Sequence, residues 1–333
     1  QTELRNAVEK LSGDLCISRP KSRLSWGIEL PFDRDYVNYV WFDALTNYIS
    51  FIGYDPTLPT FDSQPLTFRN KWPALHVIGK DIMVPAHGIY WPIMLHALGF
   101  PDEQMPSLLV HGWWNISGAK MSKSLGNIVD PDVLADKYGV EALRYYLMIA
   151  ITTGQDVDFS EEHLIQFYNR DLANNLGNML SRTLSMIQKY RGRQVRRPPP
   201  NLRPPYECKS WQNYTDTMGT LAVHQCIYIA VGAAGFCNQY IEEQKPWALA
   251  KDPNQSDRLD AVLYHSAEAL RISAILISPV LPKAAHGIFD QLNWKTELTA
   301  KEERFSLADA EWGKLPDGHV VGKPTPLFPR IEE

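Results

Sequence analysis

The spacing of apolar residues along the chain changes near residue 130. Before that point, short apolar runs at 75–78 and 107–110 alternate with glycine, proline and charged residues, which is typical of buried strands separated by turns. Beyond it, apolar residues recur with the spacing of one face of an amphipathic helix. The pattern predicts an α/β part followed by an all-α helix bundle. The clearest helical face contains Leu259, Val262, Leu263, Ala267 and Leu270.

A β-branched and aromatic run at 37–42 predicts a further strand, which passes at Asp43 into a helix. Trp41 and Tyr48 lie on either side of this junction, and their spacing allows both side chains to face one pocket. Tryptophan and tyrosine are also common in protein cores, and the spacing alone does not separate the two interpretations.

The strand predicted at 75–78 ends at Gly79-Lys80-Asp81, and a helix through Trp91 follows. Ligands of parallel α/β sheets bind at the carboxyl ends of the strands. A carboxylate at such an end, here Asp81, can accept hydrogen bonds from an ammonium group or from ribose hydroxyls. It can equally cap the following helix.

A cationic loop follows the strand predicted at 107–110, and Asp130-Pro131 opens a helix after it. Lysine ammonium groups bind phosphate oxygens as point charges, and glycines on both sides give the loop freedom to move. By composition alone the loop also fits an exposed polar turn. Its sequence is Lys120-Met121-Ser122-Lys123-Ser124, between Gly118 and Gly126.

In the helical part, Asn174, Asn178 and Arg182 share one predicted helix face because they are four residues apart. Amides and a guanidinium in such a row can read or stack on RNA bases, and they can also make contacts within the helix. Trp247 follows a proline, a position typical of core tryptophans. A connector at 191–205, rich in arginine and proline, fits either a contact to RNA phosphates or a solvated loop.

Composition narrows the class of protein. The chain has 333 residues, of which 44% are hydrophobic and 21% charged, enough for about two domains of a soluble protein. No apolar stretch is long enough to predict a membrane span. The net charge of −5 does not by itself indicate a nucleic-acid partner. Four widely spaced cysteines, without a CxxC or HExxH motif, predict buried thiols rather than a metal site.

Taken as an ordered string, residues 120–124 match the KMSKS motif of class I aminoacyl-tRNA synthetases. The continuation at 125–131 resembles the methionyl branch of that family. The segment 39–45 resembles the branch's methionine pocket, and Gly79-Lys80-Asp81-Ile82 resembles its adenosine- and amino-acid-binding stretch. The branch places a histidine five residues after the aspartate, whereas His87 here comes six residues after Asp81.

The resemblance implies roles for individual residues. It implies that Trp41, Tyr48, Asp81, His87 and Trp91 bind methionine. It implies that Lys120 and Lys123 are catalytic, because they stabilise the charge that builds on departing pyrophosphate. The implied ATP-binding residues are Gly79, Asp81, Lys120, Met121, Ser122, Lys123 and Ser124. The implied anticodon-binding residues are Asn174, Asn178, Arg182 and Trp247, with the tryptophan stacking on the first base of CAU.

The resemblance also implies a fold in four parts: a remnant of a connective insert at 1–20, the second half of a Rossmann-like catalytic domain at 21–128, a stem-contact segment at 129–160 and a helical anticodon-binding domain at 161–333. The half-site with the HIGH-type motif is expected to precede this chain, so we expect the chain to be inactive alone. No zinc site is expected, because any structural zinc would lie in the connective insert.

The implied activity is ATP-dependent ligation of methionine to tRNA(Met) through methionyl-adenylate, with Mg²⁺ accompanying ATP. The expected partners are a tRNA with a CAU anticodon, methionine and ATP, without a membrane. The protein is expected to be a monomer in the cytoplasm or in an organellar matrix. Two alternatives stay open: a class I synthetase for another apolar amino acid, and a tRNA-binding paralogue without catalysis.

Overall fold

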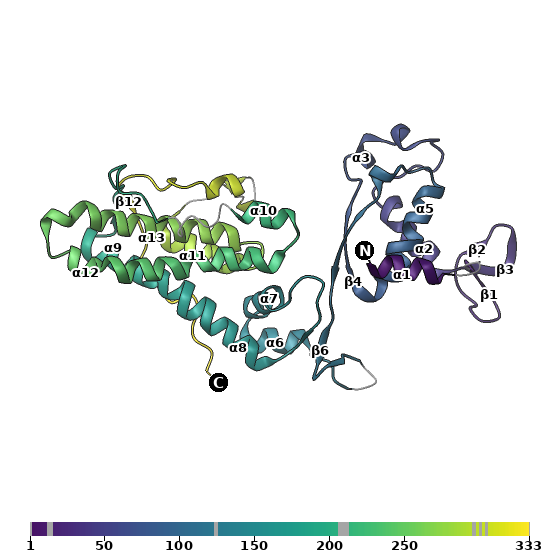
Figure 1. Cartoon of the computed structure of the whole chain (residues 1–333), viewed down its shortest axis with the longest axis horizontal. Helices are drawn as coiled ribbons and strands as arrows, with labels where there is room; N and C mark the ends of the chain where they lie inside the picture. The colour runs from purple at the N-terminus through teal and green to yellow at the C-terminus, as the bar shows by residue number, and fades with distance from the viewer. Residues whose placement is uncertain are drawn as a thin grey trace. The chain divides into compact units, whose positions relative to one another are not determined.

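A computed structural model describes residues 2–11, 16–122, 126–205, 213–294, 298–299, 302–303 and 306–332. The chain separates into two compact units, Gln1–Trp113 and Trp114–Glu333, and each is described by itself. The first unit mixes strands and helices, and the second is mostly helical (Figure 1). The predicted order of an α/β part followed by a helix bundle is therefore confirmed.

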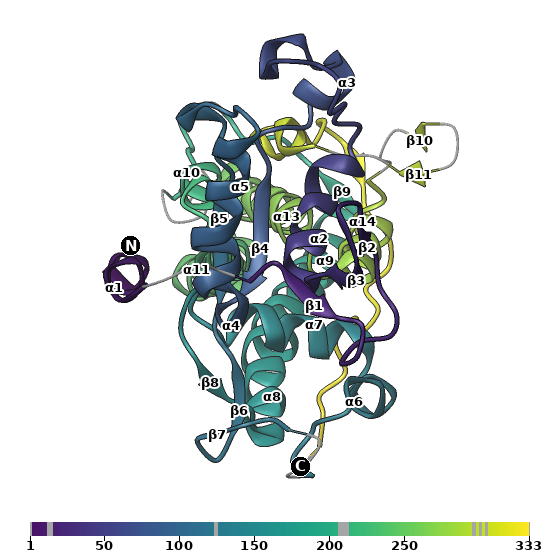
Figure 2. The ribbon, with the colours of Figure 1, turned by 90° about the vertical axis from the view of Figure 1, so that its right-hand side faces the viewer.

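Two parallel strands organise the first unit. β4 (Leu75–Gly79) and β5 (Ser107–His111) pair in register, from Leu75 opposite Ser107 to Gly79 opposite His111 (Figure 2). Parallel strands need a long crossover between them, and the chain between β4 and β5 supplies it as helix. The helices of this unit are α1 (Thr2–Lys10), α2 (Val40–Ser50), α3 (Leu66–Arg69), α4 (Lys80–Ile82), a π-helical segment (Met83–Tyr90) and α5 (Trp91–Ala97).

The strand predicted at 37–42 is wrong in its position. β3 covers Asp33–Asn38, and α2 begins at Val40, so Trp41 lies in a helix. The β-propensity of Val40, Trp41 and Phe42 is overridden because a helix beginning here turns Leu45 and Ile49 into the core. As a result, Trp41 and Tyr48 lie two turns apart on one helix rather than on two sides of a bend.

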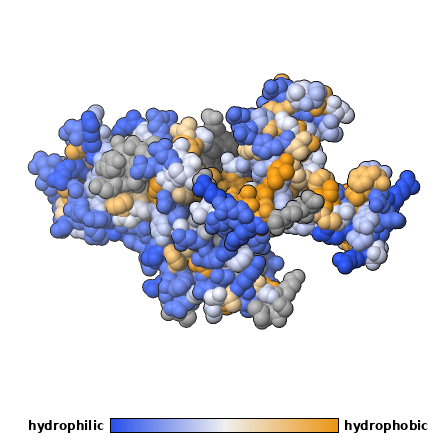
Figure 3. Space-filling view, turned by 45° about the vertical axis from the view of Figure 1, so that its right-hand side comes forward, coloured by the Kyte–Doolittle hydropathy of each residue, from blue (hydrophilic) through white to orange (hydrophobic). Residues whose placement is uncertain are grey.

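A small antiparallel sheet of order β1-β3-β2 projects from the first unit. It is formed by β1 (Ser18–Pro20), β2 (Glu29–Leu30) and β3. Three apolar side chains around it, Trp26, Ile28 and Phe32, are exposed, and hydrophobic colour is visible on this sheet at the right of Figure 3. The sheet thus contributes little to the unit's main core cluster, which is built from aromatic and aliphatic side chains of α2, α3 and α5 together with Trp72 and Phe100.

The second unit begins with a three-stranded sheet of order β7-β6-β8. Its strands are β6 (Trp114–Ile116), β7 (Ala119–Lys120) and β8 (Val157–Asp158). Asp130 caps α6 by accepting from the backbone N–H of Asp132, as the Asp130-Pro131 pair predicts. The helices next to this sheet are α6 (Pro131–Tyr138), α7 (Val140–Ile149) and α8 (Glu161–Phe167).

The rest of the second unit is a helix bundle around α13 (Ser256–Ile277). Every residue from 259 to 277 is buried, so α13 is enclosed on all sides by other elements. α11 (Val223–Gln244) runs beside it over most of its length (Figure 1). The other bundle elements are a π-helical segment (Tyr168–Gly177), α9 (Asn178–Arg191), α10 (Tyr214–Gly219), α12 (Pro246–Leu249) and α14 (Pro282–Leu292); the short strands are β9 (Gln194–Val195), β10 (Leu298–Thr299), β11 (Glu302–Glu303) and β12 (His319–Val320).

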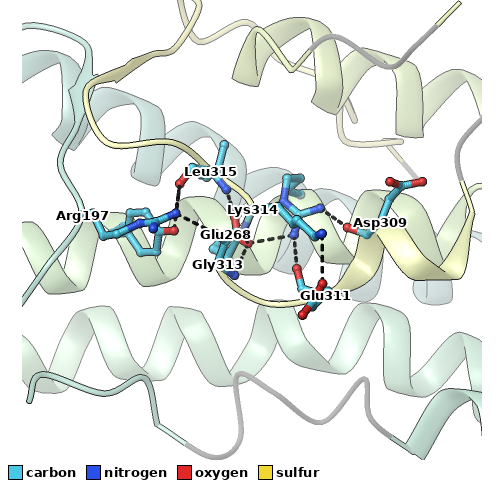
Figure 4. A network of polar contacts seen from close by, with 9 residues as sticks. Arg197, Glu268, Asp309, Glu311, Gly313, Lys314 and Leu315 are labelled. Carbon is cyan, nitrogen blue, oxygen red and sulfur yellow. Dashed lines mark hydrogen bonds and ion pairs between the residues drawn. The ribbon is translucent and has the colours of Figure 1, made fainter. Parts of the chain in front are cut away.

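A buried ion pair fastens the segment at 309–315 to α13. Glu268 and Arg271 have no exposed side-chain surface and pair at 2.8 Å. The carboxylate of Glu268 accepts from the backbone N–H groups of Gly313, Lys314 and Leu315, at 2.6, 2.7 and 3.3 Å (Figure 4). Arg271 donates to the backbone carbonyls of Asp309 and Glu311. The negative charge is therefore balanced by one guanidinium and three N–H dipoles.

Replacing Glu268 by glutamine leaves the Arg271 charge buried without its partner. We expect Glu268→Gln to lower the free energy of unfolding by about 3 kcal/mol, measured by denaturant titration. Glu311→Gln is the matched control, because the Glu311 carboxylate is largely exposed and pairs with Lys314 at the surface. A loss for Glu268→Gln no larger than that of the control would contradict this account of the ion pair.

Candidate functional site

An aromatic and histidine cluster lies in the first unit, and it contains four of the five residues predicted to bind methionine. Trp41 and Tyr48 come from α2, His87 from the π-helical segment Met83–Tyr90, and Trp91 from the start of α5. The ring of His87 lies 6.0 Å from that of Trp41 and 5.6 Å from that of Tyr48, centre to centre and edge to face. The rings of Tyr48 and Trp91 are 6.0 Å apart.

Two hydrogen bonds fix the orientation of the His87 ring. Nδ1 lies 2.9 Å from the backbone carbonyl of Ile82, which can only accept, so Nδ1 carries a proton. In the neutral ring, Nε2 then accepts from the hydroxyl of Tyr48 at 2.8 Å. The chain leaves helical geometry at Val84, between Asp81 and His87. His87 is thereby held against Tyr48 despite the longer spacing.

His76 is a member of this cluster that the sequence reasoning missed. Its Nε2 accepts from the indole N–H of Trp91 at 3.3 Å, and its ring lies 4.2 Å from that of Tyr48. Burial, and to a smaller extent the neighbouring His87, lower the pKa of His76 to about 4. A signal was present in the sequence, because His76 occupies an inward position of β4 between the outward Leu75 and Val77.

The cluster differs in exposure from residue to residue. Trp91 is completely buried and His87 nearly so, whereas Trp41 and Tyr48 are partly exposed. An open pocket of about 360 Å³ lies beside Tyr48 and His76, and its other lining residues come from α2 and the two residues after it, from β4 and from the segment before β4. Tyr48 is therefore the partly exposed member of the cluster that lines this pocket, and Trp41 is partly exposed outside its lining.

Gly79 and Asp81 lie at the carboxyl end of β4, where His111 ends the parallel neighbour β5. A Cβ atom on Gly79 would lie 2.6 Å from Oδ1 of Asp81, so any larger residue would displace the carboxylate. Gly79 is the N-cap residue of α4, hence the alternative role of Asp81 as the cap does not apply. Asp81 is exposed and lies just after the end of β4.

The lysine loop belongs to the second unit. Lys120 ends β7, in a hairpin whose turn at Ser117 and Gly118 has positive φ angles. The side chain of Asn127 closes the base of the loop, because its oxygen accepts from the N–H of Ser122 at 2.8 Å and its nitrogen donates to the carbonyl of Lys120 at 3.3 Å. Met121 and Ser122 are partly buried. The predicted residues Lys123 and Ser124 lie outside the described residues.

Three residues predicted to contact an anticodon lie four residues apart along the π-helical segment Tyr168–Gly177 and α9. Asn174, in the π-helical segment Tyr168–Gly177, is exposed to solvent. Asn178, at the start of α9, is exposed as well. Arg182 is partly buried and donates to the carboxylate of Glu242 on α11 at 2.5 Å. The fourth predicted residue, Trp247, lies on α12 and is 40% exposed, which is more than a core tryptophan would be.

The arginines of the connector at 191–205 are mostly committed to contacts within the protein. Arg191 binds Asp260 and Ser256, and Arg193 donates to the carbonyl of Val321 at 2.8 Å. Arg197 donates to the carbonyls of Gly313 and Leu315 at 2.7 and 3.1 Å. These three side chains hold the connector against the bundle, and a contact of the connector to RNA phosphates stays a prediction.

Two kinds of feature are absent from the described residues. No group of three or more His, Cys, Asp and Glu side chains in this part of the chain is arranged to hold a metal ion. None of its helices combines the length and the apolar character needed to cross a lipid bilayer.

Comparison with known families gives two matches. Residues 2–184 match the model described as tRNA synthetases class I (M). Residues 209–333 match the anticodon binding domain of methionyl tRNA ligase. The first match alone covers more than half of the chain.

Individual relatives agree with these families. The chain is 42% identical to the methionine–tRNA ligase of Clostridium tetani, over 99% of this chain and 50% of that protein. It is 38% identical to the corresponding ligase of Lactococcus lactis, over 99% of this chain and 48% of the relative. The chain therefore spans about half the length of the curated relatives it matches.

Solved structures are similar over nearly the whole chain. Methionyl-tRNA synthetase of Mycobacterium tuberculosis, bound by methionyl-adenylate, superposes with a TM-score of 0.82 at 34% identity, covering 98% of this chain and 63% of that one. The apo form of the same enzyme gives a TM-score of 0.81 at 32% identity, covering 100% of this chain and 64% of that one.

The low pKa of His76 predicts an acid-sensitive stability. As pH falls from about 6.5 to 4, the unfolded chain protonates His76 while the folded chain keeps it neutral, so folding loses on the order of 3 kcal/mol across that window. His76→Gln removes this term, and its unfolding free energy should fall less than that of the wild type between pH 7.5 and pH 4.5. His163→Gln, at an exposed histidine, is the control and should follow the wild type. If the unfolding free energy of His76→Gln fell with pH as steeply as that of the wild type, the lowered pKa of His76 would be refuted.

Proposed function

This chain belongs to the class I tRNA synthetase family for methionine, and on that premise we propose that it takes part in ATP-dependent ligation of methionine to tRNA(Met). The observation that carries the proposal is the Trp41–Tyr48–His87 arrangement in the first unit. The relatives named methionine–tRNA ligase, and a similar structure that holds methionyl-adenylate, support the same reaction.

The aromatic cluster suits a methionine side chain. A thioether is apolar and polarisable, and it is bound well by aromatic edges and faces. Trp41 and Tyr48 present such surfaces, and the His87 hydrogen bond holds the Tyr48 hydroxyl in one direction. The buried rings of Trp91 and His76 pack against the Tyr48 ring. In this proposal Asp81 receives the ammonium group of methionine or the ribose of ATP.

The proposed chemistry has two steps. A carboxylate oxygen of methionine attacks the α-phosphorus of ATP, which enters as its magnesium complex, and the bond to the bridging oxygen breaks as pyrophosphate leaves. A ribose hydroxyl of the terminal adenosine of tRNA then attacks the methionyl carbonyl carbon, and AMP leaves. Lys120 and Lys123 would stabilise the charge on pyrophosphate by electrostatics, and Gly79, Met121, Ser122 and Ser124 would complete the ATP contacts.

The exposed polar face of the bundle supports RNA recognition. Asn174 and Asn178 can bind base edges, and Trp247 offers an exposed ring on which a base can stack. Arg182 is oriented by Glu242. We propose CAU as the anticodon that this face reads. We also propose that the chain divides into four parts, with boundaries after residues 20, 128 and 160. The protein is proposed to be a monomer located in the cytoplasm or in an organellar matrix.

ATP–pyrophosphate exchange tests the proposed reaction. The protein expressed from its complete reading frame is assayed with methionine, leucine, isoleucine and valine in turn. The proposal expects exchange with methionine alone. Exchange with another amino acid would contradict the methionine pocket, and absence of exchange together with tight tRNA binding would favour the non-catalytic alternative.

Removing one hydroxyl tests the pocket itself. Tyr48→Phe leaves Nε2 of His87 without its donor, and we expect the KM for methionine in the exchange reaction to rise about tenfold with the KM for ATP unchanged. Tyr54→Phe is the matched control, since the Tyr54 ring packs against Phe68 and Phe100 and should tolerate the change. Equal KM values for methionine in the two variants would rule out the role given to Tyr48.

A further inference from the structure

We infer that Asn175 and Asn238 are positioning residues for RNA binding, because they fix the rotation of the π-helical segment Tyr168–Gly177 from which the exposed Asn174 projects. The inference rests on the proposed anticodon-binding function of that face. It assigns a role to two asparagines that do not themselves belong to the face.

Three hydrogen bonds join this segment to α11. The amide nitrogen of Asn175 donates to the backbone carbonyl of Val231 at 3.2 Å. The amide nitrogen of Asn238 donates to the backbone carbonyl of Asn175 at 3.0 Å and to its side-chain oxygen at 3.2 Å. Val231 and Asn238 lie two turns apart on α11 and so present one face of that helix. Asn175 is therefore hydrogen-bonded to α11 through both its side chain and its backbone.

The opposite side of the segment is held by the end of the chain. Asn169 donates to the backbone carbonyl of Ile331 at 2.8 Å and accepts from its N–H at 3.0 Å. A Cβ atom on Gly177 would lie 3.3 Å from the ring of Phe328, so the ring packs closely on bare backbone. With contacts on two sides, the segment leaves its third side, with Asn174, exposed.

The π-helical geometry explains why these hydrogen bonds affect the direction of the Asn174 side chain. A π-helix has more residues per turn than an α-helix, so the direction of a side chain depends on keeping that geometry. If the segment relaxed to α-helix, each residue would turn by a larger angle than in the π-helix, so the direction of the Asn174 side chain relative to α11 would change. The bonds of Asn175 to α11 oppose that rotation directly.

The test measures RNA binding and methionine activation separately, in the protein expressed from its complete reading frame. The probe is a fluorescent RNA hairpin of the anticodon arm with a CAU loop, compared with the same hairpin carrying a changed loop. We expect Asn175→Ala and Asn238→Ala each to weaken binding of the CAU hairpin about tenfold, because each removes hydrogen bonds between the π-helical segment and α11. Methionine-dependent ATP–pyrophosphate exchange, which needs no RNA, should stay within about twofold of wild type.

Three further variants make the result decisive. Asn178→Ala removes a proposed direct contact and reports on the face itself. Asn169→Ala removes two hydrogen bonds from the same segment on the side of Ile331, and it should bind the hairpin nearly as wild type does. Asn238→Leu keeps a side chain that branches at Cγ and removes the donor, and it replaces Asn238→Ala if that variant does not fold.

The outcomes separate the inference from the proposed function. If Asn178→Ala weakens hairpin binding and both Asn175→Ala and Asn238→Leu leave it unchanged, the positioning role is wrong and the proposed RNA face stands. If Asn169→Ala weakens binding as much as Asn175→Ala, the effect is general loosening and the inference is overturned. If neither Asn178→Ala nor the positioning variants alter binding, the proposed function of this face fails.

Discussion

The buried carboxylate of Glu268 is the interaction on which the order of the second unit depends. A charge without solvent contact is tolerated only where partners surround it, and here Arg271 and three backbone N–H groups do so. The same network anchors the segment at 309–315, to which Arg197 of the connector also binds. One ion pair thereby ties together the central helix, the connector and the later part of the chain.

Partly buried hydrogen bonds set the geometry of both candidate sites in the same manner. In the first unit, the Tyr48–His87 hydrogen bond joins α2 to the π-helical segment Met83–Tyr90. In the second, Asn175 joins another π-helical segment to α11. If the two elements joined by such a bond slid past each other, a donor or acceptor would lose its partner. Each bond therefore favours one register of the two elements. The groups proposed to touch ligand, Trp41 and Asn174, lie beside these fixed points.

Sequence reasoning succeeded where the signal is local. The helical periodicity after residue 130, the Asp130-Pro131 helix start and the strand before the lysine loop were all predictable from neighbouring residues. It failed where tertiary contacts decide: Trp41 lies in a helix because Leu45 and Ile49 must reach the core, and the connector arginines bind carbonyls that are distant in sequence. His76 and Asn127 were missed because their partners, Trp91 and the backbone of Lys120 and Ser122, become neighbours only in the fold.

The central claim is that one protein joins a methionine pocket to a face that reads the anticodon CAU. The most direct measurement is methionine charging of a tRNA specific for another amino acid, before and after its anticodon is replaced by CAU. The account predicts that the replacement raises kcat/KM by about a hundredfold or more, since stacking and base-edge contacts each contribute on this scale. Equal charging of the two tRNAs, with tRNA(Met) charged normally, would contradict it.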